Sequence, residues 1–91
     1  MFEFYLDKPQ KWEDIYHSLV MDGKQHGVVV TGNAQRGGGI HPKAQGEFAV
    51  IGEKIKVVVT RKPALLPKSL IESHVRGFIK KKEANLIGLY R

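Results

Sequence analysis

A glycine-rich segment carries the residues whose spacing comes nearest to a known catalytic chemistry. Gly32 to Gly37 gives the pattern G-x-x-x-x-G directly after an apolar run, which is where phosphate-binding loops begin. Gly38 and Gly39 stand where such a loop needs lysine and then serine or threonine to reach the terminal phosphates and Mg²⁺. The segment therefore does not predict a nucleotide-hydrolysing site.

The same segment has the composition of a loop that binds a small ligand. Its backbone N–H groups can form a nest for an anion, and basic side chains beside them add positive charge. The alternative is a mobile hairpin loop in which glycine serves only the backbone conformation. If this loop, residues 32–46, binds a ligand, the residues expected to do so are Arg36, Gly37, Gly38, Gly39, His41 and Lys43.

A second candidate site is a concentration of positive charge. The chain has 15 Lys and Arg against nine Asp and Glu, and its net charge is +6. Residues 1–23 hold two basic and five acidic side chains, whereas residues 24–91 hold 13 basic and four acidic ones. A dense group of this kind binds phosphate backbones without reading their sequence. The residues expected to form such a surface are Lys54, Lys56, Arg61, Lys62, Lys68, Arg76, Lys80, Lys81 and Lys82.

Other catalytic and metal-binding chemistry has little support in the residues present. There is no cysteine, which excludes a disulfide, a thiolate metal site and a cysteine nucleophile. The four histidines match no zinc spacing, and no serine lies in a G-x-S-x-G elbow. We therefore expect no metal and no cofactor, and a binding protein is favoured over an enzyme.

Three functions follow from these observations. The leading hypothesis is a small basic module that docks an anionic partner, DNA or RNA, through residues 54–82. The first alternative is a protein-interaction or self-assembling domain, because an acidic helix over 9–23 complements a basic helix over 67–82 in sign. The second alternative is a small-ligand-binding protein with its site at the loop over 32–46, which a pocket between sheet and helices would support.

The elements that must position these residues follow from hydrophobic periodicity. Alternation or continuous apolar runs predict strands over 2–6, 27–32, 48–51, 54–60 and 85–90, with a two-residue turn at Gly52-Glu53. Residues 33–45 read as a loop because of their three glycines and proline. The two helices have apolar stripes at helical spacing, which consist of Trp12, Ile15, Tyr16, Leu19 and Val20 in the first and Leu70, Ile71, Val75, Phe78 and Ile79 in the second.

The predicted fold is a single α+β domain over residues 1–91, with the order β-α-β-β-β-α-β. The strand–helix–strand opening predicts a parallel crossover, and hence a mixed sheet of about five strands with both helices on one face, a variant of the ferredoxin-like plait. The sequence shows no secretory signal and no apolar run long enough to cross a bilayer. A soluble cytoplasmic protein without a membrane partner is therefore expected.

Overall fold

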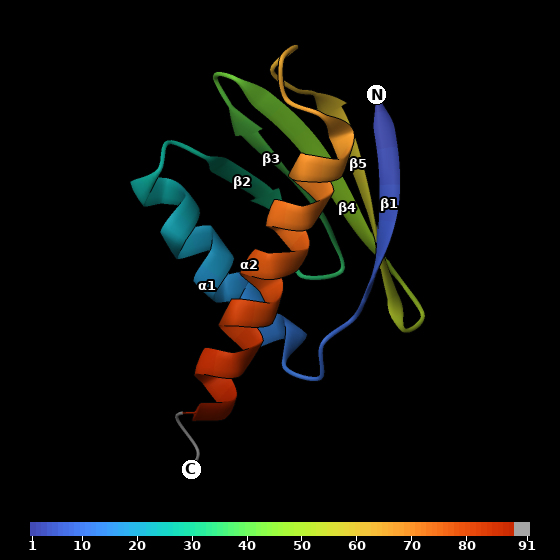
Figure 1. Cartoon of the computed structure of the whole chain (residues 1–91). Helices are drawn as coiled ribbons and strands as arrows, with labels where there is room; N and C mark the ends of the chain where they lie inside the picture. Colours follow the sequence, from blue (N-terminus) through green and yellow to red (C-terminus); the bar gives the residue numbers. More distant parts are fainter. Residues whose placement is uncertain (89–91) are drawn as a thin grey trace.

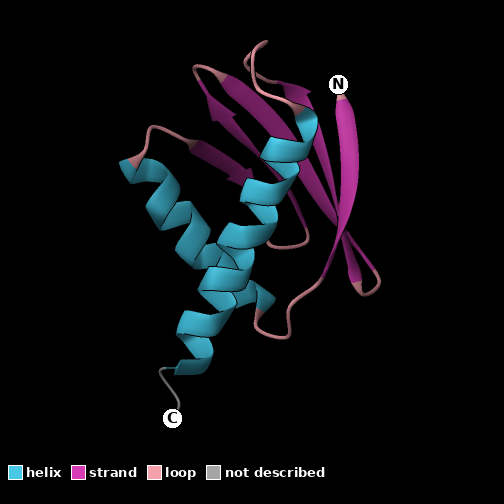
Figure 2. Ribbon diagram, viewed as in Figure 1, coloured by secondary structure: helices cyan, strands magenta, loops and turns pink. Residues whose placement is uncertain are grey.

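The computed structural model describes residues 1–88 of the chain, with side chains up to residue 85. These residues form one α+β unit in which a five-stranded antiparallel sheet carries both helices on one face (Figures 1 and 2). The prediction of five strands and two helices is thus confirmed. The elements are β1 (Phe2–Asp7), α1 (Trp12–Gln25), β2 (Val29–Gly32), β3 (Arg36–His41), β4 (Ala44–Ile51), β5 (Lys54–Arg61) and α2 (Lys68–Gly88).

The strands lie in the order β1-β5-β4-β3-β2, and every neighbouring pair is antiparallel. The prediction of a mixed sheet is therefore wrong, and the plait variant that depended on a parallel crossover is not the arrangement observed. Short connections join β2 to β5 as successive hairpins, and such connections impose antiparallel pairing. Strand β5 in turn pairs with β1, so β1 and β2 lie at opposite edges of the sheet (Figure 1).

The glycine-rich segment is a strand, whereas the sequence predicted a loop over 33–45. Gly37, Gly38 and Gly39 have no positive φ and lie in β3, paired with β2 on one side and β4 on the other. Glycine is unfavourable in an isolated strand, but two paired neighbours satisfy the backbone here. The added strand β3 is the main reason why the element order differs from the prediction.

The end of the chain also differs from the prediction. Residues 85–88, which were expected to begin a last strand over 85–90, continue helix α2, and residues 89 and 90 lie outside the described part. Where the order was predicted as β-α-β-β-β-α-β, it is β-α-β-β-β-β-α over the described residues. The hairpin turn at Gly52-Glu53 is confirmed, because Ile51 pairs with Lys54 and Gly52 has a φ of 60°.

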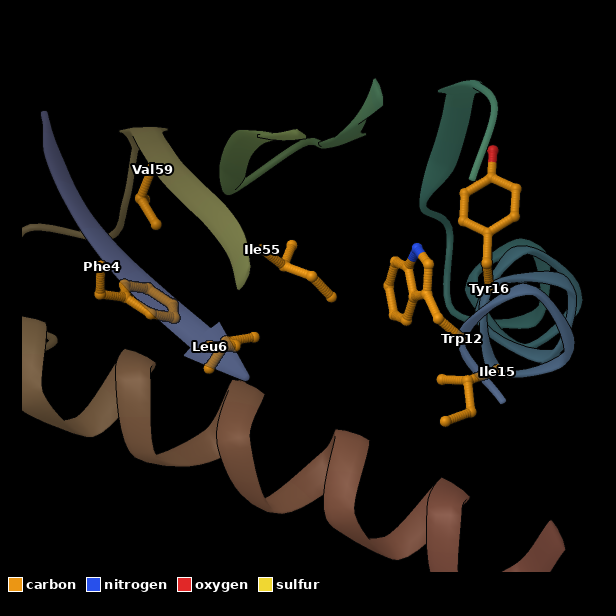
Figure 3. Close-up of a cluster of buried hydrophobic side chains, with 7 residues drawn as sticks. All are labelled: Phe4, Leu6, Trp12, Ile15, Tyr16, Ile55 and Val59. Atoms are coloured by element: carbon orange, nitrogen blue, oxygen red, sulfur yellow. The ribbon is translucent and has the colours of Figure 1, made fainter. Parts of the chain in front are cut away.

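The hydrophobic core joins the inner face of the sheet to α1. The buried side chains are Phe4 and Leu6 of β1, Ile55 and Val59 of β5, and Trp12, Ile15 and Tyr16 of α1 (Figure 3). None of them comes from α2, whose Ile71, Val75 and Ile79 pack against this cluster but stay half-buried. Helix α2 therefore covers the sheet without closing tightly onto it.

Candidate ligand cavity

A cavity of about 350 Å³ lies between the inner face of the sheet and the two helices. Its walls are almost entirely apolar and draw on both helices and on all five strands. The residues that the helices contribute are Trp12, Tyr16 and Leu19 of α1 and Ile71, Val75 and Ile79 of α2. The stripes that the sequence assigned to core packing therefore also form the walls of a pocket.

Small residues in β3 and β4 leave the space that forms the cavity. Gly39 and Gly46 pair with each other across the two strands and lie in the cavity wall. A methyl group built at Gly39 would lie 3.5 Å from Cγ1 of Val28, which is ordinary van der Waals contact. Neither a positive φ nor a close backbone contact therefore requires glycine at position 39, and its missing side chain adds directly to the cavity volume.

Three aromatic rings form one wall. The ring centroids of Trp12 and Phe48 are 5.8 Å apart in an edge-to-face arrangement, and Tyr16 lies 6.2 Å from Trp12 and 5.7 Å from Phe48. The indole Nε1 donates a hydrogen bond of 2.6 Å to the carbonyl oxygen of Ala34, which fixes the orientation of the ring. This wall is rigid, and it presents ring faces and edges to any occupant.

Histidine 41 supplies a polar group at one end of the cavity. His41 is half-buried in the cavity wall, and its Nδ1 accepts the backbone N–H of Lys43 at 3.0 Å. A neutral ring that accepts at Nδ1 carries its proton on Nε2, so that Nε2 is a hydrogen-bond donor. The Arg61 guanidinium donates to the carbonyl oxygen of His41 at 2.7 Å, which places a positive charge beside the same end.

A second hollow, of about 640 Å³, lies on the outer face of the sheet, which no helix covers (Figure 2). Glycines again form much of its floor, and its rim includes the charged residues Arg36, Glu47 and Lys56. Strand β3 lacks side chains at three successive positions, so both faces of the sheet are hollowed along it.

The candidate residues of the predicted glycine-rich loop are therefore divided between the two faces of the sheet. Among them, only His41 borders the inner cavity alone, Arg36 and Gly37 border the outer hollow alone, and Gly38 and Gly39 border both. Lys43 lies in the turn between β3 and β4. The predicted segment contributes Gly38, Gly39 and His41 to the lining of the cavity. The prediction did not include the aromatic wall, for which the available signal was the position of Phe48 next to small residues.

Four of the predicted basic residues form ion pairs with acidic residues of the same chain. Lys54 contacts Asp7, and this hydrogen bond lowers the pKa of the Asp7 carboxyl below its ordinary value of 3.8. The remaining pairs are Lys56 with Glu3 at 3.3 Å, Arg76 with Glu72 at 2.9 Å, and Lys82 with Asp22. The last of these links α2 to α1, so charges of opposite sign on the two helices meet within one molecule.

The other predicted basic residues fall into two groups. Arg61, Lys62 and Lys68 lie at or beside the β5–α2 connection, near the cavity end that contains His41. Lys62 donates to the carbonyl oxygen of Leu66 at 2.9 Å, and Lys68 lies over the ring of Phe2. Lys80 and Lys81 follow along α2 and form no ion pair within the part of the chain that the structure describes.

Residues 1–88 contain no group of three or more side chains that could hold a metal ion. No helix among them is long and apolar enough to span a bilayer. No protein-family model, curated protein or solved structure matches the chain, so the function has to be argued from the chemistry of the cavity.

Proposed function

We propose that this chain is a non-enzymatic binding protein that takes one small apolar ligand into the cavity between the sheet and the helices. The observation that carries the proposal is the volume of about 350 Å³ lined by apolar walls. An engineered apolar cavity of about 150 Å³ stays dry and binds benzene. A ligand of roughly two fused rings, or a medium alkyl chain, is therefore of suitable size.

The energetic argument for an occupant rests on the small size of the core. Apolar surface left in water forfeits about 25 cal/mol for each Å². The half-buried Ile71, Val75 and Ile79 line the cavity, and only seven hydrophobic side chains are buried among the described residues. An apolar ligand would complete the contact between α2 and the sheet, which the protein's own side chains leave unfinished.

A neutral fluorescent probe tests the proposal. N-phenyl-1-naphthylamine emits strongly only in apolar surroundings, and we expect its emission to rise saturably with a stoichiometry of one per chain. Trp12, the only tryptophan, lines the cavity, so its emission should change over the same concentration range. A linear, non-saturating rise of probe emission would contradict the proposal.

One residue on each face of the sheet provides a pair of variants. Gly39→Val fills the inner cavity and is expected to weaken probe binding at least about tenfold, because the probe and the new methyl groups compete for the same volume. Ala49→Val adds methyl groups at a residue that lines only the outer hollow, and it should leave binding within about twofold. Far-UV circular dichroism verifies that both variants fold, and equal losses in both would contradict the inner location.

The second candidate function is docking of an anionic macromolecule, with nucleic acid favoured. Its support is two groups of basic residues that form no ion pair among the described residues. They are Arg61, Lys62 and Lys68 at the β5–α2 connection, and Lys80 and Lys81 along α2. Anisotropy of labelled single-stranded RNA and duplex DNA at about 50 and 200 mM salt tests it, since phosphate binding weakens steeply over this range. Binding that does not depend on salt, or that survives Lys80→Glu with Lys81→Glu, would count against it.

A further inference from the structure

Three chain segments meet at the end of the sheet where β3 turns into β4, and none contains an acidic residue. They are residues 24–28 at the end of α1, 41–44 in the β3–β4 turn, and 61–68 before α2. Strand register places them together, because Val29 pairs with Ile40 and Gln45 pairs with Arg61. Their charged residues are all basic: Lys24, Lys43, Arg61, Lys62 and Lys68. We name these three segments the basic end.

The cavity reaches the basic end. Val28, His41 and Ala44 belong to or adjoin these segments, and all three line the cavity. In Figure 1 the two helices cross near the middle of the molecule and diverge toward this end. The cavity therefore extends to the basic end, where the polar part of a bound ligand would meet basic side chains.

The opposite end of the sheet has a different charge pattern. Its connections and the flanking element ends contain Asp7 and Glu53 among the basic residues, and Asp7 is paired with Lys54. The three segments of the basic end hold five basic and no acidic side chains, so their net charge is positive, and Glu47 is the one acidic residue in the cavity lining within the described residues. A positive net charge attracts an anionic ligand and orients it before contact.

We infer that the ligand is an amphipathic carboxylate, with an alkyl or aromatic body in the cavity and its carboxylate at the basic end. The inference rests on the proposed function and names the class of ligand. His41 Nε2–H is the hydrogen-bond donor that meets the carboxylate, and Arg61, held at the His41 carbonyl, supplies the positive charge. The contacts of the structure fix two donors at this end of the cavity, the His41 ring and the Arg61 guanidinium, and two donors match the two oxygens of a carboxylate.

Displacement of bound N-phenyl-1-naphthylamine by decanoate and by 1-decanol at pH 8 tests the inference. The two competitors share one alkyl chain, and only decanoate is anionic. We expect decanoate to displace the probe at about a tenfold lower concentration, the effect of one charge-assisted hydrogen bond. Equal displacement by the two would overturn the inference while leaving the proposed function intact; failure of the probe itself to bind would overturn the proposed function.

Variants at the two ends locate the head group. His41→Leu keeps apolar bulk and removes the donor, so it should abolish most of the preference for decanoate and leave decanol binding unchanged. Arg61→Gln should weaken decanoate severalfold, whereas Lys8→Gln removes the same charge at the opposite end and should have no effect beyond about twofold. Loss of decanoate and decanol binding alike in His41→Leu, with the fold intact, would overturn the assignment of His41.

Discussion

Trp12 and Tyr16 lie one turn apart on α1 and both line the cavity, but only one of their polar groups has a partner. The Trp12 indole N–H donates to the carbonyl oxygen of Ala34, which ties the start of the helix to the β2–β3 connection. The Tyr16 hydroxyl takes part in none of the hydrogen bonds among the described residues. It is not a buried atom left without a partner, because the described residues contain no such side-chain atom. The two aromatic residues therefore contribute differently to stability although they share one wall.

This difference predicts the effect of replacing each residue with phenylalanine. Trp12→Phe leaves the Ala34 carbonyl without its donor and removes ring volume, so we expect a loss of about 1–3 kcal/mol in the free energy of unfolding. Tyr16→Phe keeps the ring and removes only the unpartnered hydroxyl, so the change should stay within about 0.5 kcal/mol. Urea denaturation followed by far-UV circular dichroism measures both, and equal losses would show that the indole hydrogen bond contributes little.

At the scale of elements, β3 is the feature that sets both the topology and the cavity. Its glycines differ in what surrounds them, although Gly37 and Gly39 lie on the same face. A Cβ atom at Gly37 would come within 3.0 Å of the Phe48 ring and still closer to the Thr31 carbonyl oxygen, whereas one at Gly39 meets only Val28 at 3.5 Å. Glycine is sterically required at position 37 and is not required at position 39.

Alanine substitutions at these two positions should therefore have opposite outcomes. Gly37→Ala has to displace Phe48 from the aromatic wall or move a backbone carbonyl, and we expect it to cost about 1–3 kcal/mol. Gly39→Ala should be neutral, or stabilise by up to about 1 kcal/mol, because alanine restricts the unfolded chain more than glycine does. Chemical denaturation of the two variants in parallel provides the measurement. Destabilisation by Gly39→Ala would contradict this prediction, because it would mean that no free space lies beside position 39 on the inner face of the sheet.

Elements that are determined by a local sequence pattern could be predicted from the sequence, whereas strand β3 could not. The apolar stripe of α1 and the turn at Gly52 depend on residues close in the chain, and both predictions are confirmed. A run of glycines has no local preference for a strand, so β3 forms only because β2 and β4 pair with it. The mixed sheet followed from the expectation that the strands on either side of α1 pair in parallel, whereas β1 and β2 lie at opposite edges of the sheet.

The candidate site shows the same limit. The sequence identified Gly39 and His41 as ligand-binding candidates in a loop, but their shared position in a cavity wall depends on the alternation of a strand. Leu70 and Phe78 were predicted on the buried stripe of α2 and are 41% and 43% exposed. The distance between α2 and the sheet determines both the presence of the cavity and the exposure of Leu70 and Phe78. No local sequence pattern specifies that distance.

At the scale of the whole molecule, α2 is held over the sheet largely by polar contacts at its margins. Arg76 donates to the carbonyl oxygen of Tyr5 at 2.8 Å, at the edge strand β1, and Lys82 pairs with Asp22 of α1. Between these contacts lie the half-buried Ile71, Val75 and Ile79, with the cavity beneath them. A hydrogen bond to a carbonyl and a partly buried ion pair each contribute on the order of 1 kcal/mol, so α2 should be the least stable of the packed elements.

Ligand binding should therefore stabilise α2 more than the sheet. A ligand at about 100 times its Kd adds about 2.7 kcal/mol to the free energy of unfolding, which raises the melting temperature. Hydrogen exchange in the presence of decanoate should slow mainly at the amides of residues 71–82, because only there does the ligand supply contacts that the apo protein lacks. Strands β1 and β5 already pack through the buried Phe4, Leu6, Ile55 and Val59, so their subglobal exchange should change little.

The Gly39→Val variant separates this mechanism from general stabilisation. Its added methyl groups lie in the same cavity, so they should slow exchange in α2 without ligand, and decanoate should then produce little further change. The outer-face variant Ala49→Val should behave like the original chain in both conditions. Uniform slowing across sheet and helices in the original chain would show that the ligand stabilises the molecule without bridging α2 to the sheet.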